Sequence, residues 1–268
     1  MILRRRRLAP FALAALLLLP AAVPASAATP SGGLSAAEAS TLTLINGQRS
    51  ALGLVALRVD SRLMEIARVR SAYQAKTDTM SHVHAGGTNV FDLIEDWNVT
   101  WYGAGEIVAV NNWPTFETSG ATALDGWMGS PTHRSIIVSA GYNYVGLRAA
   151  YNATGRIYWT AVFLKGPDRT GAWAKNTDQR SSRYDATRSR VTFSWAGDDR
   201  RLQVLTSGFR YFQVQRRRTD QTTWHDYGIT TATSKTVIWH RGHSYEFRVR
   251  ARDKAGNWGG WNVATVTL

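Results

Sequence analysis

A histidine lies in the run from Asp125 to Arg134, which reads Asp-Gly-Trp-Met-Gly-Ser-Pro-Thr-His-Arg. Ser130 suits a helix N-cap and Pro131 suits the first helical position, so a short helix is expected to begin here. His133 would then lie in its first turn, where the positive end of the helix dipole disfavours an imidazolium ion. A neutral imidazole is the form that a metal ligand or a general base requires.

The elements that must position this histidine follow a simple order, with helices first and strands after them. Asp60 is expected to cap a helix on which Leu63, Ala67 and Tyr73 recur at helical spacing. Residues 144–150 and 156–163 each alternate apolar and polar side chains, as strands do. This order predicts an α+β domain with three layers, α-β-α, over residues 35–165.

Residues 1–27 have the organisation of a secretory signal peptide. Arg4 to Arg7 form a basic segment, and the apolar run from Phe11 to Leu19 is too short to span a bilayer. Ala25-Ser26-Ala27 fits a signal-peptidase site, so the mature chain is expected to start at Ala28 and to contain no transmembrane segment. The predicted location is therefore extracellular or in the cell envelope.

The composition separates the chain into two parts with different charge. The sequence has 268 residues and no cysteine, which excludes disulfides and thiolate zinc sites and is typical of an exported bacterial protein. Residues 28–165 carry 10 basic and 10 acidic side chains, whereas residues 166–268 carry 18 basic and 9 acidic ones. This asymmetry predicts two domains with different tasks.

The basic part begins with a polar segment, residues 166–184, which we interpret as a linker. Beyond it, apolar residues alternate in several short runs separated by turn residues, for example at Val191, Phe193 and Trp195. Runs of this kind over residues 185–268 are typical of an all-β sandwich.

The first domain resembles the CAP superfamily of cysteine-rich secretory proteins in its cysteine-free bacterial, SCP-like form. The similarity lies in an ordered series of short motifs rather than in any one of them. These are Asn46-x-x-Arg49, Asp60-x-x-Leu63, Ser81-His82, Ala104-Gly105-Glu106-Ile107, Trp127-x-x-Ser130-Pro131-x-His133-Arg134, and Tyr158-Trp159-Thr160-Ala161-Val162-Phe163.

The resemblance implies a central cavity with His82, Glu106 and His133 around it. Ser130 stands where the eukaryotic-type members have a second acid, and Tyr158 stands where they have a second histidine. The implied cavity residues are therefore His82, Glu106, His133 and Tyr158.

Two kinds of chemistry are open to these residues. His82, Glu106 and His133 could hold Zn²⁺ through two nitrogens and one oxygen, leaving a position for a water that hydrolyses an ester or amide. Alternatively, Glu106 could brace the two rings in a buried hydrogen-bond network that needs no cofactor. The spacings of 24 and 27 residues match no short metal motif.

The second domain resembles a fibronectin type III module. The resemblance rests on Trp195 and on the run from Ser244 to Asn257, which includes an expected tyrosine corner at Tyr245. Alternation along that run places Arg248, Arg250 and Arg252 together on the outward face. The outward position Arg217 of the neighbouring strand would add to this basic surface.

Together these observations favour a secreted bacterial binding protein. Its cavity would take a small molecule, a lipid or a metal ion, and its basic second domain would anchor it to an anionic cell-wall polymer. Nucleic acid is not an expected partner of an exported protein. The alternatives are a hydrolase, an esterase or peptidase with or without Zn²⁺, and a purely structural protein whose cavity residues only brace the fold.

Overall fold

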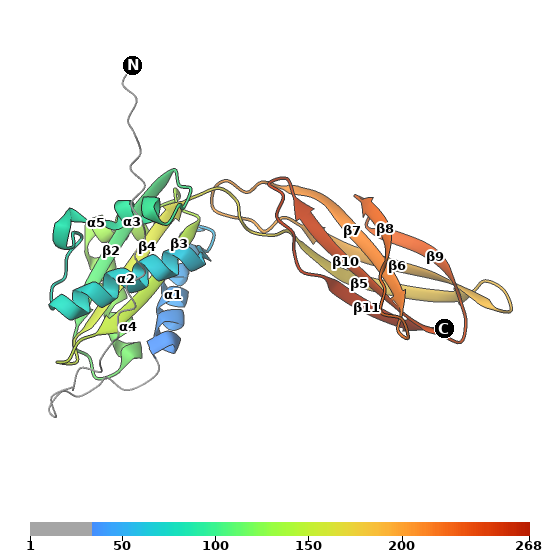
Figure 1. Ribbon diagram of the computed structural model, residues 1–268, viewed down its shortest axis with the longest axis horizontal. Helices are drawn as coiled ribbons and strands as arrows, with labels where there is room; N and C mark the ends of the chain where they lie inside the picture. Colours follow the sequence, from blue (N-terminus) through green and yellow to red (C-terminus); the bar gives the residue numbers. More distant parts are fainter. Residues whose placement is uncertain (1–33) are drawn as a thin grey trace, which may run out of the picture.

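The structure is a computed structural model that describes residues 34–268. It shows two bodies joined end to end, a domain of helices and strands followed by a domain of strands alone (Figure 1). The predicted signal peptide, residues 1–27, lies outside the described residues. Within residues 34–268, the helices are all too short or too polar to cross a membrane.

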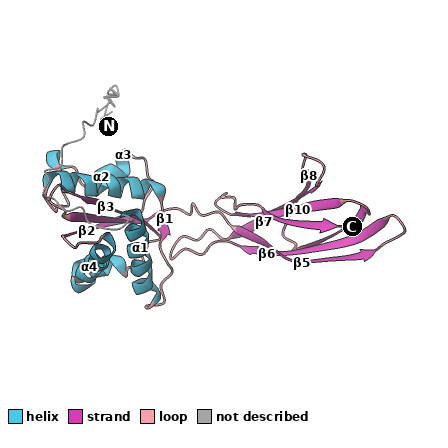
Figure 2. Ribbon diagram, turned by 90° about the horizontal axis from the view of Figure 1, so that it is seen from below, coloured by secondary structure: helices cyan, strands magenta, loops and turns pink. Residues whose placement is uncertain are grey.

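The first domain has the three expected layers. Its sheet has the strand order β1-β3-β4-β2, with β1 parallel to β3 and the other neighbours antiparallel. Helices α2 and α3 lie on one face of the sheet, and α1 and α4 lie on the other (Figure 2). The elements are α1 (Leu34–Ser50), β1 (Arg58–Val59), α2 (Ser61–Thr77), the 3-10 turn η1 (Ala85–Gly87), α3 (Val90–Asp96), β2 (Gly103–Asn111), α4 (Phe116–Gly129), α5 (Pro131–Ile137), β3 (Tyr144–Tyr151) and β4 (Ile157–Lys165).

The core of this domain lies on both faces of strand β4. Every residue of β4 except Lys165 is buried, as expected for a central strand covered by helices on both sides. Helix α2 approaches β3 closely at Gly146, where a Cβ atom would lie 2.1 Å from the carbonyl carbon of Leu63. Glycine at this position therefore sets the distance between α2 and the sheet.

The second domain is a β-sandwich of two sheets, with the strand orders β5-β6-β9 and β11-β10-β7-β8. Its core contains the expected Trp195, and Tyr245 donates a hydrogen bond from its hydroxyl to the His240 carbonyl at 3.1 Å, as in a tyrosine corner. The assignment to fibronectin type III stays a prediction. The strands are β5 (Trp173–Arg183), β6 (Arg188–Asp198), β7 (Phe209–Arg218), β8 (His225–Thr230), β9 (Ser234–His240), β10 (Ser244–Asp253) and β11 (Asn262–Thr267).

The prediction of a linker over residues 166–184 is wrong for most of that range. Residues 173–183 form β5, which pairs with β6 from Trp173 opposite Asp198 to Arg183 opposite Ser189. Most side chains of β5 are exposed, so the strand lacks the alternation of apolar residues that would have revealed it. The segment that connects the domains is therefore only 166–172.

The loop between β6 and β7 docks onto the first domain. Leu202 on this loop is 2% exposed and packs in one apolar cluster with Leu63 and Ile66 of α2. The next residue, Gln203, accepts a hydrogen bond from the Val55 amide at 2.7 Å. The Asn143 side chain donates to the Val204 carbonyl at 3.2 Å. These contacts join the two domains through packed side chains as well as through the chain itself.

We predict that Leu202→Ala destabilises the first domain, because it removes a side chain from a shared apolar cluster. A buried leucine replaced by alanine costs about 2–5 kcal/mol of unfolding free energy. Thermal unfolding of the intact protein measures this loss. Leu205→Ala, on the same loop but 43% exposed, is the control and should change stability little. Equal effects of the two substitutions would contradict the docking described above.

Candidate functional site

The site is built around Glu106 on β2, an edge strand of the first sheet. Glu106 lies opposite Val162 of β4 and points to the face that α2 covers. Its side chain is only 3% exposed, so it needs a partner of opposite charge. That partner is Arg70 of α2, whose side chain is fully buried.

Arg70 holds both oxygens of Glu106 in a forked ion pair. Its Nε donates to Oε1 at 2.6 Å and its Nη2 donates to Oε2 at 2.8 Å. The same Nη2 donates to the main-chain carbonyl of His82 at 2.8 Å. Arg70 therefore fixes the carboxylate and also the loop that carries His82.

His82 completes this group of three side chains. Its Nδ1 lies 2.7 Å from Oε2 of Glu106, and because a carboxylate only accepts, Nδ1 is the protonated nitrogen in the neutral ring. Nε2 then remains as a hydrogen-bond acceptor. The side chain of His82 is 53% exposed, so the ring stands between the buried ion pair and solvent.

A cavity of about 520 Å³ opens beside this group, at the edge of β2. His82 and Glu106 belong to its lining, and most of the remaining lining residues are apolar. A Cβ atom on Gly105 would lie 3.0 Å from the Tyr142 hydroxyl oxygen, so the strand passes close to this wall of the cavity. The lining residues are His82, Val83, Asn89, Val90, Phe91, Ala104, Gly105, Glu106, Ile136 and Tyr142.

His133 lies in the first turn of α5, as expected, with Ser130 at the N-cap position and Pro131 as the first helical residue. The Ser130 hydroxyl makes no capping hydrogen bond, so backbone geometry alone defines this cap. Burial lowers the pKa of His133, and the nearby His82 lowers it further. His133 is therefore close enough to His82 for their charges to interact, but it is not among the residues that line the cavity.

Helix α5 is held in place by a second buried arginine, Arg49 of α1. Its Nη1 donates to the carbonyls of Ile137 and Ser139, both at 2.8 Å. Its Nε donates to the Val55 carbonyl at 3.2 Å. These bonds satisfy carbonyl groups at the C-terminal end of α5, and they fix the helix that supplies Ile136 to the cavity.

Tyr158 lies away from the other candidates. It is four residues from Val162, the residue opposite Glu106, which corresponds to roughly 13 Å along the strand. Its hydroxyl donates to Asp78 at the C-cap of α2. Burial and this hydrogen bond raise the pKa of Tyr158 to about 12. Tyr158 thus closes the far end of the α2–β4 contact and does not line the cavity.

The three residues His82, Glu106 and His133 do not fit a metal ion in this arrangement. Both oxygens of Glu106 already accept hydrogen bonds from Arg70, whose positive charge would repel a cation. Within residues 34–268, the acidic and histidine ligand atoms that converge within 4.8 Å belong instead to Asp168, Asp199 and Asp253. Asp168 and Asp199 accept hydrogen bonds from the main-chain amides of Ser207 and Gly208, in the loop between β6 and β7. Asp253 accepts one from the main-chain amide of Asn257.

A further histidine, His84, is buried next to the site. The ring is 9% exposed and stacks on Tyr73 with 3.8 Å between the ring centroids. Burial lowers the pKa of His84 to about 4; the charge of Arg70 lowers it too, whereas Glu106 acts in the opposite direction. The ring is therefore neutral at physiological pH.

Sequence reasoning missed Arg70, the residue that organises the site. A signal for it was present, because Arg70 follows Leu63 by seven residues and so lies on the same helix face. An arginine on the apolar face of an amphipathic helix needs a buried partner. Gln74, one turn later, repeats this pattern by donating to Thr160 of β4 at 2.9 Å.

The predicted basic residues of the second domain do share one sheet face. Arg248, Arg250 and Arg252 alternate along β10, and Arg217 lies on the neighbouring strand β7. Arg217 forms an ion pair with Glu246. The other three arginines stack on tryptophan rings, a feature that the sequence did not indicate.

Comparison with known proteins identifies the first domain. Residues 42–163 match the model of the CAP family, described as the Cysteine-rich secretory protein family, so this part of the chain is a CAP domain. The chain is 29% identical over 128 residues to the uncharacterized membrane protein YlbC of Bacillus subtilis, and 26% identical over 131 residues to the uncharacterized protein YkwD of the same species.

These alignments cover 48% and 49% of this chain, and only 34% and 48% of the two relatives. The chain therefore spans less than half the length of either curated relative. Among solved structures, an extracellular protein of Bacillus anthracis that contains an SCP domain has a TM-score of 0.43 and 22% identity. That comparison covers 50% of this chain and 45% of the other.

We predict that His84 makes the protein less stable in acid. Because its pKa is near 6.5 in the unfolded chain and about 4 in the folded protein, stability is complete above pH 6.5 and falls progressively towards pH 4. The loss from this ring amounts to about 3 kcal/mol. Melting temperatures of wild type and His84→Phe, measured from neutral to acidic pH, test this.

His84→Phe should reduce the acid sensitivity, because phenylalanine can stack on Tyr73 and cannot bind a proton. His225→Phe, at an exposed position on β8, is the matched control and should leave the pH profile unchanged. An identical pH profile for wild type and His84→Phe would refute the assignment.

Proposed function

We propose that this chain is a secreted bacterial binding protein that takes a small amphipathic ligand into the cavity of its CAP domain. The observation that carries this proposal is a cavity of about 520 Å³ that is lined mostly by apolar residues and that also contains the polar pair His82 and Glu106. Cavities of this size, apolar with few polar groups, are typical of sites for small molecules.

Two parts of the cavity lining support different parts of the ligand. Phe91 and Ile136 offer apolar contacts, and the exposed side chain of Val83 extends the apolar surface beyond the mouth. At the polar pair, the carboxylate of Glu106 is neutralised by Arg70, so it does not repel an anionic or polar head group. The His82 ring, with Nε2 unused by the protein, is the group that would contact this head group.

In this proposal the second domain, which we assign to the fibronectin type III class, anchors the protein at the cell envelope. Its charge supports this role, since residues 166–268 carry 18 basic and 9 acidic side chains. The junction at Leu202 would hold the cavity at a fixed place relative to the anchor.

We predict that Ile136→Trp fills the cavity and weakens ligand binding at least about tenfold. The probe is cis-parinaric acid, a fluorescent long-chain carboxylate, titrated into the intact protein. Ile229→Trp places the same side chain at a position on β8 that is 62% exposed, and it should bind the probe like wild type. Saturable binding that both variants retain, or no saturable binding by wild type, would refute the cavity as the site.

A hydrolase is the second candidate, favoured by the short contact between His82 and Glu106. A carboxylate that orients a histidine through Nδ1 leaves Nε2 able to act as a general base. The hydroxyl of the neighbouring Ser81 donates to the Val83 carbonyl instead of to Nε2 of His82. A water molecule would be the nucleophile.

Activity on an ester and peptide panel that disappears in both His82→Ala and Glu106→Gln would establish hydrolysis. Elemental analysis of the same purified samples would show whether zinc accompanies it. Turnover equal in wild type and both variants would exclude this site as its source.

A further inference from the structure

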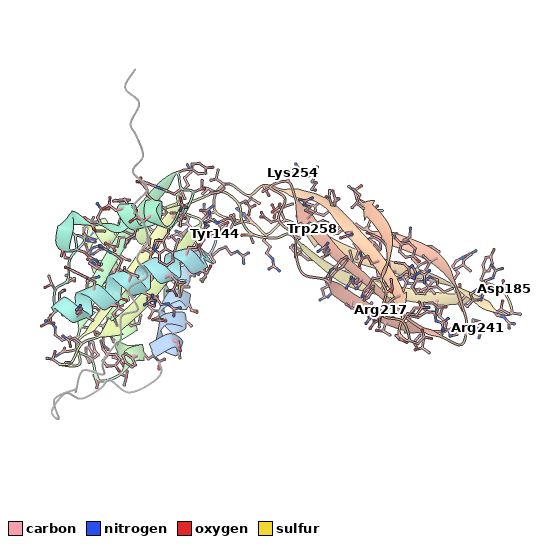
Figure 3. All side chains as sticks on the ribbon, in the orientation of Figure 1. Tyr144, Asp185, Arg217, Arg241, Lys254 and Trp258 are labelled. Atoms are coloured by element: carbon pink, nitrogen blue, oxygen red, sulfur yellow. The ribbon has the colours of Figure 1, made fainter. Side chains whose placement is uncertain are left out.

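Three tryptophans and three arginines of the second domain form one continuous stack, which we call the Trp–Arg ladder. Arg248 lies between Trp224 and Trp261, with its guanidinium carbon 3.8 and 4.2 Å from the two ring centroids. Arg250 lies between Trp261 and Trp258, at 4.4 and 4.1 Å. Arg252 contacts the Trp258 ring at 5.2 Å. Trp258 lies at the end of the sandwich nearest the first domain, and Arg217 lies farther along (Figure 3).

The guanidinium groups of the ladder carry charge that no carboxylate pairs with. Within residues 34–268, Arg248, Arg250 and Arg252 form no ion pair. They donate to neutral acceptors instead. Arg248 bonds the Gln215 side-chain oxygen at 2.9 and 2.5 Å, and Arg250 bonds that of Gln213 at 2.9 and 2.7 Å. Asp226 and Glu246 lie nearby, but they bond to Gln213 and Arg217 respectively.

These contacts fix the arginines before any partner arrives. Contact with two tryptophan rings each, together with the bonds to glutamine, restricts the Arg248 and Arg250 side chains, which would otherwise lose much rotamer freedom on binding. Arg252 is held by its bonds to the Gly256 carbonyl and the Tyr211 hydroxyl, both at 3.0 Å. The Nη1 groups of Arg248 and Arg250 donate no hydrogen bond within the described chain, so they remain for a ligand. Alternate residues on a strand are about 6.7 Å apart, so the three charges form a line roughly 13 Å long.

The backbone next to the ladder is tightly packed as well. A Cβ atom on Gly259 would lie 1.8 Å from the Ala172 carbonyl oxygen, and one on Gly171 would lie 2.2 Å from the Trp258 carbonyl oxygen. The segment Trp258-Gly259-Gly260-Trp261 is therefore pressed against the connection between the domains.

We infer that the ladder binds a linear phosphodiester polymer of the cell envelope, an inference that rests on the anchoring role proposed above. A single line of charges at a regular interval is complementary to a chain of regularly spaced phosphates, and guanidinium forks suit phosphate oxygens. The arginines cover the faces of Trp224, Trp258 and Trp261, which leaves them unsuited to stacking on sugars or to entering a bilayer. The linear polymer is therefore favoured over a glycan or a membrane.

The experiment measures binding of the intact protein to immobilised poly(glycerol phosphate). Replacing Arg248, Arg250 and Arg252 together by glutamine should weaken binding at least about tenfold. The slope of log K against log salt should lose about two units, because each phosphate contact on a flexible chain contributes about 0.7. Should the triple variant not fold, Arg250→Gln alone is expected to remove about 0.7 of the slope.

The matched control replaces Arg180, Arg183 and Arg190 of the opposite sheet by glutamine. It removes the same net charge from exposed positions and should keep the wild-type affinity. Replacement of the three ladder arginines by lysine retains charge but loses the forked, stacked geometry, so its affinity should be intermediate.

Equal loss in the control and the ladder variant would overturn the inference, since net charge alone would then explain binding. Tighter binding to phosphatidylglycerol vesicles or to polygalacturonate than to poly(glycerol phosphate) would also overturn it. Binding of cis-parinaric acid to the ladder variants, and of the polymer to Ile136→Trp, separates failure of the ladder from failure of the cavity.

Discussion

A buried ion pair between Arg70 and Glu106 organises the first domain. It joins the middle of α2 to the edge strand β2, and through the His82 carbonyl it also fixes the loop that follows α2. Removing both charges from water is costly, and the forked geometry with its additional hydrogen bond offsets that cost. The cavity exists where it does because this pair sets the position of the loop against the free edge of β2.

The chemistry of the site follows from the same pair. A carboxylate that already accepts from a guanidinium is a poor metal ligand, but it is a good acceptor for the Nδ1 proton of His82. The histidine is thereby held in one orientation at the mouth of an apolar cavity. Such an arrangement suits recognition of a polar head group, and it would suit general-base chemistry only with a water positioned at Nε2.

The sequence predicted much of the fold and less of the site. The order of the helices and strands, the short helix carrying His133 and the core role of Trp195 followed from periodicity and capping residues. Strand β5 was not predicted because its residues, most of them exposed, show no alternation of apolar and polar side chains. The roles of Arg70 and Leu202 were not predicted because their partners are distant in sequence. A charged residue on a helix, or an apolar residue in a loop, gives no indication of which distant residue it contacts. Tyr158 was predicted to lie at the cavity because of its position in a family motif. In the structure its hydroxyl bonds to Asp78 instead, and that contact depends on where α2 ends.

The most direct test of this account is the unfolding free energy of variants of the ion pair. Arg70→Met leaves Glu106 buried and unpaired, and it is predicted to lower stability by roughly 3–5 kcal/mol. Arg70→Met combined with Glu106→Leu removes both charges, so most of that stability should return even though His82 loses its acceptor. The central role of the pair would be contradicted if Arg70→Met had the same unfolding free energy as wild type. It would also be contradicted if the double variant were less stable than Arg70→Met.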